Sequence, residues 1–219
     1  WGGFDAMRIL EYRYNNQPEL AAAPFSNRAK GFVPSSGSGA LVLESLESAE
    51  NRNATILAEI VGTSVNSGGM TDGGSMTAAN SQAVINCVEK AIMEASIASS
   101  EIDLINGHFT GTKGDAKEAE NWLQALKLKA HEVPYFNSTK GMIGHALAAS
   151  GSIELVGCVL QMQHNFIHGN LNAYPLNEEI ADAVPAHKIP EKSISHSINY
   201  LAKASFGFGD VNACVVLKK

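Results

Sequence analysis

The sequence predicts an α/β fold built around a mixed five-stranded sheet. From residue 54 onward, short apolar runs rich in β-branched residues alternate with longer segments whose apolar residues recur at helical spacing. Two strand-like runs then follow each other directly at the C-terminus. The resulting order is βαβαβαββ, which connection rules arrange as a mostly parallel sheet with right-handed crossovers and an antiparallel C-terminal hairpin.

The N-terminal part of the chain is expected to contain little regular structure. Its expected elements, in order, are a short helix over 4–13, a loop over 15–39, a strand over 40–44, a strand over 54–62 and a surface loop over 64–75. The strand over 54–62 is the first of the five in the main sheet.

The remaining elements complete the alternation. A helix over 77–99 places Val84, Val88, Ala91 and Ile92 on one face. A helix beginning at Asp115 is expected to be capped by that residue together with Glu118, in a D-x-x-E capping box. The other expected elements are strands over 102–105, 133–137, 193–204 and 212–218, a helix over 143–163 that is apolar nearly all round and hence buried on most sides, and an irregular or short helical stretch over 175–190.

Composition narrows the classes of function. The chain has 219 residues, 45% of them hydrophobic, which suits one or two globular domains with a sizeable core. Sixteen Lys and Arg against 22 Asp and Glu give a net charge of −6, and the basic residues are scattered, so a nucleic-acid partner is not expected. The longest weakly polar run, 146–159, is too short and too polar to cross a bilayer, so no membrane insertion is expected.

Cysteine usage and the leading residues indicate a cytoplasmic protein. Cys87, Cys158 and Cys214 form an odd set without C-x-x-C spacing, so neither a disulfide framework nor a metal site is expected. No basic segment precedes an apolar stretch at the N-terminus, so no signal peptide is expected.

The candidate site lies in the loops that follow the strands, because ligands of open α/β sheets bind beyond the C-terminal ends of the strands. These loops carry His108, Lys140 and His145. Two histidines and a lysine at one sheet edge suggest polarisation of a carbonyl or stabilisation of an enolate. His145 is expected at the N-terminus of the apolar helix, where the helix dipole lowers its pKa and keeps the imidazole a neutral donor.

Simpler readings of the same residues stay open on spacing alone. Lys140 can be a solvated loop lysine, Glu118 can be only a helix cap, and the glycine pair Gly207 and Gly209 can serve only a turn. Most loop histidines lie at the surface, and that assignment is made for the other five, which are His131, His164, His168, His187 and His196.

Taken together, the motifs resemble the C-terminal half of an elongating β-ketoacyl-acyl carrier protein synthase, a thiolase-fold condensing enzyme. The likeness spans nearly the whole chain. The matching stretches are 106–112 (NGHFTGT, against N-A-H-G-T-x-T), 114–118 (against G-D-x-x-E), 138–151 (STKGMIGHALAASG, against S-x-K-x-x-x-G-H-x-x-x-A-x-G), 205–212 (SFGFGDVN, against S-F-G-F-G-G-T-N) and 24–44.

The resemblance implies a fold and a reaction. Residues 1–48 are then a remnant of the N-terminal thiolase-like half, and 49–219 are the C-terminal half of a layered αβαβα fold, with the helix over 143–163 lying against two layers. The implied reaction is an acyl transfer by decarboxylative Claisen condensation, in fatty-acid or polyketide-like synthesis. Its partners are acyl carrier protein and the missing half or a homologous subunit, and the complete enzyme is a dimer. No cofactor is implied beyond the phosphopantetheine arm that carries the substrate.

The resemblance also assigns roles to residues. His108 and His145 are the pair that supports decarboxylation and the enolate oxygen, and Lys140 organises the site with Glu118 as its ion-pair partner. The substrate-binding residues are Thr110 and Thr112, which meet the phosphopantetheine arm, and Phe206 and Phe208, the latter as a mobile aromatic gate.

The departures from the family pattern are equally specific. The family's nucleophile, a Cys in a turn such as A-C-S-S, is nowhere in the sequence, and the three cysteines fall within predicted helices and the last strand as core residues. The chain alone is therefore expected to lack condensing activity. Phe109 stands where the family has Gly and is expected to crowd the His108 loop, and Asp210-Val211 replaces Gly-Thr. Two other readings remain, a non-catalytic accessory subunit of the chain-length-factor type and a stand-alone acyl-binding domain.

Overall fold

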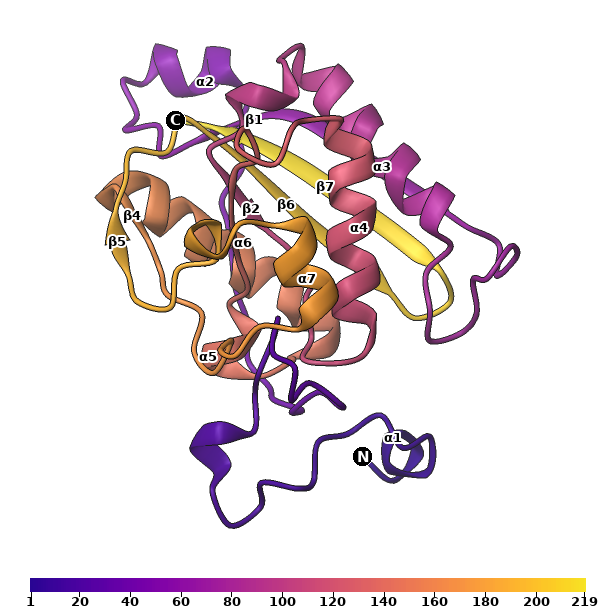
Figure 1. The fold of residues 1–219 in the computed structure, drawn as a ribbon. Coiled ribbons are helices and arrows are strands. Elements are labelled where there is room, and N and C mark those ends of the chain that lie inside the picture. The colour runs from indigo at the N-terminus through magenta and orange to yellow at the C-terminus, as the bar shows by residue number, and fades with distance from the viewer.

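A mixed five-stranded sheet forms the centre of the computed structural model, which describes residues 1–219 (Figure 1). The strand order across the sheet is β1-β7-β6-β2-β3. β1 and β6 each pair antiparallel to β7, whereas β2 pairs parallel to both β6 and β3. The strands are β1 (Glu59–Ser67), β2 (Leu104–Asn106), β3 (Tyr135–Asn137), β6 (Tyr200–Gly207) and β7 (Val211–Lys218). The predicted mixed sheet with its C-terminal hairpin is confirmed.

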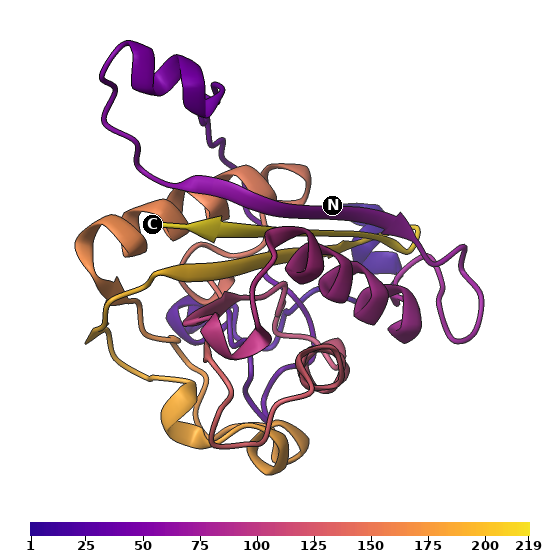
Figure 2. The ribbon, with the colours of Figure 1, turned by 90° about the horizontal axis from the view of Figure 1, so that it is seen from above.

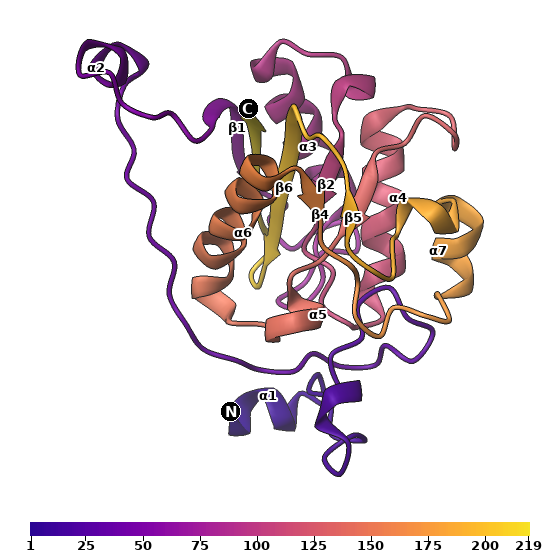
Figure 3. The same ribbon diagram turned by 90° about the vertical axis from the view of Figure 1, so that its left-hand side faces the viewer.

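Helices cover both faces of this sheet, as the view along its edge shows (Figure 3). α3 (Ser81–Ala95) and α4 (Gly114–Leu126) lie on one face, and α6 (Ser150–His164) lies on the other. A core cluster of 26 buried residues fills the first side, and a smaller cluster of seven fills the second. The remaining helices are α1 (Gly2–Ala6), α2 (Leu46–Asn51), α5 (Lys140–Ile143) and α7 (Glu178–Ala183), with 3-10 turns at Pro18–Leu20, Ser99–Glu101, Leu147–Ala149 and Ala186–Lys188.

The helix α3 has the buried face that the sequence predicts. Val84, Val88, Ala91 and Ile92 are all buried on it. The helix is shorter than the predicted 77–99, because the side chain of Asn80 accepts a hydrogen bond from a backbone N–H of the first turn and so fixes its start.

Two predicted strands in the first third of the chain are wrong in position. Residues 40–44 form no strand, and Val42 is 95% exposed, because no neighbouring strand is present to pair with them. The strand expected over 54–62 lies instead at β1, so the first residues of the expected loop 64–75 are paired with β7. The expected helix over 4–13 is limited to α1, and α2 was not expected.

The helix expected over 143–163 is interrupted. Gly144 adopts a positive φ of 74°, and the backbone of His145 pairs with the N-terminal segment, donating to the carbonyl of Val33 (2.7 Å). α5 therefore ends at Ile143, and α6 begins only at Ser150. The outer side of α6 is half-buried in this chain, so its packing between two layers stays a prediction.

The strand expected over 193–204 is also divided. Its first part is β5 (Ile194–Ser195), which pairs antiparallel with β4 (Phe166–Ile167) in a separate two-stranded sheet. The second part, β6, joins the main sheet at Tyr200. The carboxylate of Asp103 accepts hydrogen bonds from the backbone of Asn199 (2.6 Å) and Tyr200 (3.1 Å) at the crossing point.

The N-terminal segment runs across the end of the sheet where the strands β2, β3 and β6 finish, from α1 to α2 (Figure 3). Seen from above, α2 stands away from the layered core (Figure 2). The division of the chain at residue 48 stays a prediction. None of the helices combines the length and apolar character needed to traverse a lipid bilayer.

Candidate active site

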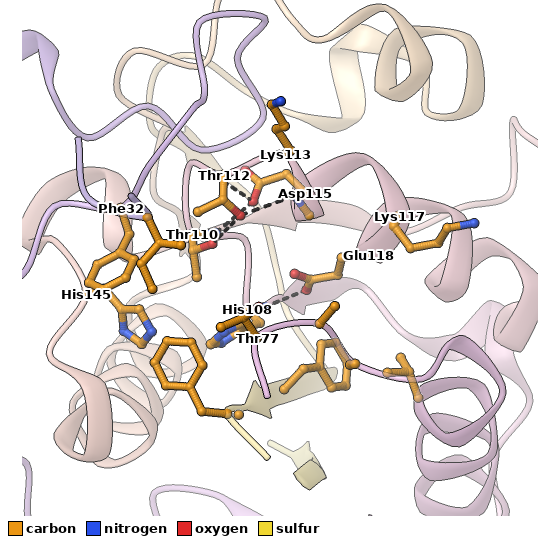
Figure 4. A pocket seen from close by; sticks show the side chains of 18 of the residues that line it. Phe32, Thr77, His108, Thr110, Thr112, Lys113, Asp115, Lys117, Glu118 and His145 are labelled. Atoms are coloured by element: carbon orange, nitrogen blue, oxygen red, sulfur yellow. Dashed lines mark hydrogen bonds between the residues drawn. The ribbon is translucent and has the colours of Figure 1, made fainter. Parts of the chain in front are cut away.

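Most of the predicted site residues follow strands that end at one edge of the sheet, and Glu118 lies on α4. Figure 4 shows the side chains of His108 and His145 near each other at this edge. His108 follows β2, and Lys140 and His145 follow β3. The turn between β6 and β7, which carries Phe208, lies at the same edge because β6 runs parallel to β2. Parallel strands thus bring together residues that are far apart in the sequence.

The imidazoles of His108 and His145 meet edge to face. Their ring centroids lie 5.3 Å apart with an interplanar angle of 83°. Two adjoining cavities, of about 430 Å³ and about 340 Å³, are both lined by these two histidines together with Phe206 and Phe208. The two rings therefore form the wall that the cavities share.

The proton position on His145 follows from its hydrogen bonds. The backbone N–H of Leu147 donates to Nδ1 of His145 (3.2 Å), and the hydroxyl of Ser150 lies 2.9 Å from the same atom. A backbone N–H can only donate, so Nδ1 is the acceptor and the neutral ring carries its proton on Nε2. Burial, and then the positive charge of Lys140, lowers the pKa of His145 to about 4. α6 begins only at Ser150, so His145 precedes this helix and does not begin it as predicted, although its ring contacts the hydroxyl of that first residue.

His108 is neutral for a similar reason. Burial lowers its pKa well below the ordinary value, and the positive charge of Lys140 adds to this effect. Its backbone N–H donates to a carboxyl oxygen of Glu118 (2.6 Å), which fixes the loop that carries the ring. Its Nδ1 atom is buried without a hydrogen-bond partner.

The capping box predicted for α4 is wrong. Lys113 is the N-cap and makes no side-chain cap, and Asp115, the acidic residue of the first turn, accepts hydrogen bonds from the preceding loop and from Phe25 instead. Glu118 accepts hydrogen bonds from His108 and from Nε1 of Trp122 (3.3 Å). Its pKa is raised to about 8 by burial and then by the negative charge of Asp115.

Asp115 organises the loop between β2 and α4. Its buried carboxylate accepts four backbone N–H groups, from Phe25 (3.0 Å), Thr110 (2.9 Å), Gly111 (3.1 Å) and Thr112 (3.3 Å). The loop is thereby tied both to the start of α4 and to the N-terminal segment.

The four residues predicted to meet the substrate all line the larger cavity. The hydroxyls of Thr110 and Thr112 lie 3.0 Å apart on its polar side. Phe206 packs against His108 with a centroid distance of 6.2 Å. Phe208 is 40% exposed in the hairpin turn and stacks on Phe4 at 5.6 Å.

The ion pair predicted between Lys140 and Glu118 is wrong. Nζ of Lys140 pairs with Oε1 of Glu154 on α6 at 2.5 Å, and Nζ of Lys203 on β6 pairs with Oε2 at 2.7 Å. Sequence reasoning missed both partners. Glu154 is the only formally charged residue in the predicted helix over 143–163, and Lys203 is the only one in the predicted strand over 193–204. Because a buried charge requires a partner of opposite charge, these two residues could have been recognised from the sequence.

Other residues differ from expectation in instructive ways. Phe109 does not crowd the His108 loop, because its ring is fully buried in the core, 4.2 Å from Phe25, and Gly107 leaves room for it. His168 is not at the surface, since it is 7% exposed and its Nδ1 lies 3.0 Å from the carbonyl of Gly169. His131, His164 and His187 are exposed as expected, and His196 is half-buried.

The three cysteines are buried free thiols, as predicted. Burial raises the pKa of each of them, that of Cys158 to about 12. None is activated as a nucleophile. No group of three or more His, Cys, Asp or Glu side chains is arranged to hold a metal ion.

Comparison with known proteins identifies the type of domain. The profile described as "Beta-ketoacyl synthase, C-terminal domain" matches residues 57–174. The chain is 36% identical over 219 residues to the chloroplastic 3-oxoacyl-[acyl-carrier-protein] synthase I of Arabidopsis thaliana, covering 98% of this chain and 44% of that protein. It is 34% identical to 3-oxoacyl-[acyl-carrier-protein] synthase 1 of Escherichia coli, covering 99% of this chain and 50% of that protein.

Solved structures agree with the sequence relatives. A type II polyketide ketosynthase in complex with its acyl-carrier protein matches with a TM-score of 0.89 at 29% identity, over 99% of this chain and 52% of that one. The ishigamide ketosynthase/chain length factor matches with a TM-score of 0.85 at 27% identity, over 100% and 50%. The fold is thus the thiolase-like fold of ketosynthases, and the chain spans about half the length of the relatives it matches.

Proposed function

Because the chain belongs to the β-ketoacyl synthase family, through that family's C-terminal domain, we propose that it is the histidine-bearing half of a synthase that catalyses decarboxylative condensation of malonyl-acyl carrier protein with an acyl thioester. The observation that carries the proposal is the convergence of His108 and His145 as neutral imidazoles on shared cavities. A thioester enolate needs such neutral donors aimed at its oxygen.

In the proposed reaction the bond between the malonyl α-carbon and its carboxylate breaks and CO₂ leaves. The electron pair moves into the enolate, whose oxygen receives hydrogen bonds from the imidazoles. Nε2–H of His145 is free to donate, since Nδ1 accepts from Leu147. The α-carbon of the enolate then attacks the acyl thioester, and the thiolate leaves as the new carbon–carbon bond forms.

The nucleophile of that acyl thioester is proposed to lie outside this chain. Its three thiols are buried, and burial holds each pKa above the ordinary value of a cysteine. A nucleophilic cysteine requires an exposed and activated position. The other half of the synthase or a homologous subunit would supply it, so this chain alone would be inactive.

The substrate arm is proposed to reach the histidines along the polar side of the larger cavity. Thr110 and Thr112 present their hydroxyls there, and Phe206 and Phe208 close the apolar side beside the histidines. Acyl carrier protein is the proposed partner, as in the solved type II ketosynthase, which was determined with its acyl-carrier protein. The complete synthase is proposed to be a dimer in the cytoplasm, a reducing location that agrees with three free thiols.

A second function is favoured by one solved relative, which is described as a ketosynthase/chain length factor. It is that of a non-catalytic accessory subunit that shapes the acyl tunnel of a partner. The residue that stands at the nucleophile position of the complete protein separates the two functions. A cysteine favours the synthase, and a Gln or another residue favours the accessory subunit.

The test of the proposal is CO₂ release from malonyl-acyl carrier protein by the complete protein. Replacing His108 or His145 by Ala should lower the rate by roughly two or more orders of magnitude, the scale of a lost oxyanion donor. His164→Ala and His187→Ala are matched controls, because both side chains are exposed. Equal rates in all four variants would contradict the proposal, and an inactive parent would favour the accessory subunit.

A further inference from the structure

We propose that Lys203 gives the site a second buried positive charge, so that the cluster of Lys140, Glu154 and Lys203 carries one positive charge in excess and attracts an anionic group of the substrate to the histidine cavities. The inference rests on the proposed function. It deepens that function by naming the charge that the substrate must carry, which is the carboxylate lost as CO₂.

The geometry of the cluster shows that one carboxylate serves two ammonium groups. Oε1 of Glu154 contacts Nζ of Lys140, and Oε2 contacts Nζ of Lys203. The side chains of all three residues are at most 3% exposed. One carboxylate therefore faces two lysine side chains, so one ammonium group has no counter-charge of its own. Burial, and also the positive charge of Lys203, lowers the pKa of Lys140, while Glu154 opposes this effect.

The other buried carboxyl groups near the site do not pair with either lysine, since both ammonium groups contact Glu154. Burial raises the pKa of Glu118 to about 8, so this carboxyl group tends to keep its proton near pH 7. Asp115 is charged, but both of its oxygens accept backbone N–H groups of the loop before α4 and of the N-terminal segment. A buried charge without a counter-charge destabilises the folded protein. An anion that binds beside it would reduce this destabilisation.

The extra charge is held close to the cavity wall. Lys203 lies on β6 two residues before Ser205, which lines the smaller cavity, and its Nζ donates to the hydroxyl of Ser205 (3.0 Å) and to the carbonyl of Ala204. These contacts fix the ammonium group on the strand that also carries Phe206. The charge therefore has a defined position relative to the cavities.

The two histidines respond to this charge. After burial, the positive charges of Lys140 and Lys203 lower the pKa of both His108 and His145, and Glu154 opposes them at His145. The same field that keeps the imidazoles neutral favours an anion beside them. Neutral donors and an excess positive charge are the combination that an enolate requires.

Lys203→Met in the complete protein tests the inference, because it leaves Lys140 and Glu154 as a matched ion pair. The pKa of His145, followed by NMR, should rise by roughly 1 from its value of about 4. CO₂ release should fall by about tenfold, which corresponds to one pKa unit of lost interaction. Lys203→Arg should restore both quantities because it restores the charge. Lys129→Met, which removes an exposed lysine, should change neither.

Stability measurements distinguish an electrostatic role of Lys203 from a purely structural one. Glu154→Gln leaves two buried ammonium groups together and should lower the unfolding midpoint much more than Lys203→Met does. An unfolded Lys203→Met with a stable Glu154→Gln would overturn the inference, as would a pKa of His145 that does not move in a folded Lys203→Met. A shifted pKa in a protein whose parent releases no CO₂ would uphold the charge excess and reject the proposed function.

Discussion

The backbone N–H of Leu147 donates a hydrogen bond to Nδ1 of His145. This contact fixes the tautomer of the imidazole and exists because α5 and α6 are separate helices. Leu147 has a positive φ of 53°, and Gly144 has one of 74°, so the backbone turns back over the ring. A continuous helix would use the N–H of Leu147 within the helix and leave Nδ1 without this donor.

The low pKa of His145 predicts an unusually acid-tolerant reaction. With a pKa of about 4, the imidazole stays neutral from pH 7 down to about pH 5, and the rate should fall only as the pH approaches 4. An ordinary histidine would lose half of its neutral form at pH 6.5. CO₂ release measured between pH 5 and 7, with circular dichroism confirming the fold, tests this. A halving near pH 6.5 would be the contrary result.

The raised pKa of Glu118 predicts that stability falls with rising pH. The folded pKa is about 8 and the ordinary value is 4.5, so the folded protein holds a proton that the unfolded chain releases in this window. The contribution of Glu118 to the free energy of unfolding should therefore decrease from pH 4.5 to pH 8. Glu118→Gln should remove that decrease and make the variant more stable than its parent at pH 8.

Denaturant unfolding of the complete protein at pH 5 and pH 8 measures the difference. Glu120→Gln on the same helix is the matched control, since Glu120 is exposed. The assignment fails if Glu118→Gln and Glu120→Gln show the same pH dependence as the parent.

Much of the fold follows from sequence periodicity because the sheet and α3 are set by apolar patterns. The elements that were misplaced depend on contacts distant in the sequence. The division of the predicted helix at Gly144 requires Val33 from the N-terminal segment, and the division of the strand before Tyr200 involves Asp103. Contacts between residues that are far apart in the sequence produce no local apolar periodicity, so the sequence pattern does not predict them.

The same distinction applies to the site. Parallel-strand rules place His108 and His145 at one edge, and the structure brings their rings together. The partner of Lys140 was missed, because an ion pair between α5 and α6 depends on how two helices pack. The lone charge of Glu154 in an apolar helix was the available signal.

Asp115→Asn is expected to destabilise the protein and loosen the His108 loop. Each carboxylate oxygen accepts two backbone N–H groups, and an amide nitrogen in place of one oxygen would face two donors. Leaving buried donors unpaired costs about 1–3 kcal/mol each, so a loss of roughly 2–6 kcal/mol is expected. Denaturant unfolding measures it, with the exposed Asp182→Asn as control. A loss below about 0.5 kcal/mol would contradict the role.

Asp210→Asn is expected to free the loop over 68–80. The buried carboxylate of Asp210, at the hairpin turn, accepts hydrogen bonds from the backbone N–H groups of Met70 (3.0 Å) and Asn80 (2.8 Å). Thr77 of the same loop lines the larger cavity. Hydrogen exchange at the backbone amides of Met70 and Asn80 should therefore accelerate in the variant. Unchanged protection of both amides would show that the loop is ordered without Asp210.

The isolated chain is expected to self-associate, to aggregate or to bind its missing half. Val42 and Leu43 are 95% and 70% exposed in a segment without partners, and Leu46, Ile56 and Leu57 are exposed nearby in the sequence. A concentration of exposed large apolar side chains of this kind is typical of an association site. Replacing Val42 and Leu43 together by Ser should reduce association in sedimentation experiments and reduce the binding of a hydrophobic dye. Leu171→Ser is the control, because Leu171 is 51% exposed elsewhere in the chain. A parent chain that sediments as a stable monomer without binding the dye would contradict the predicted association through these residues.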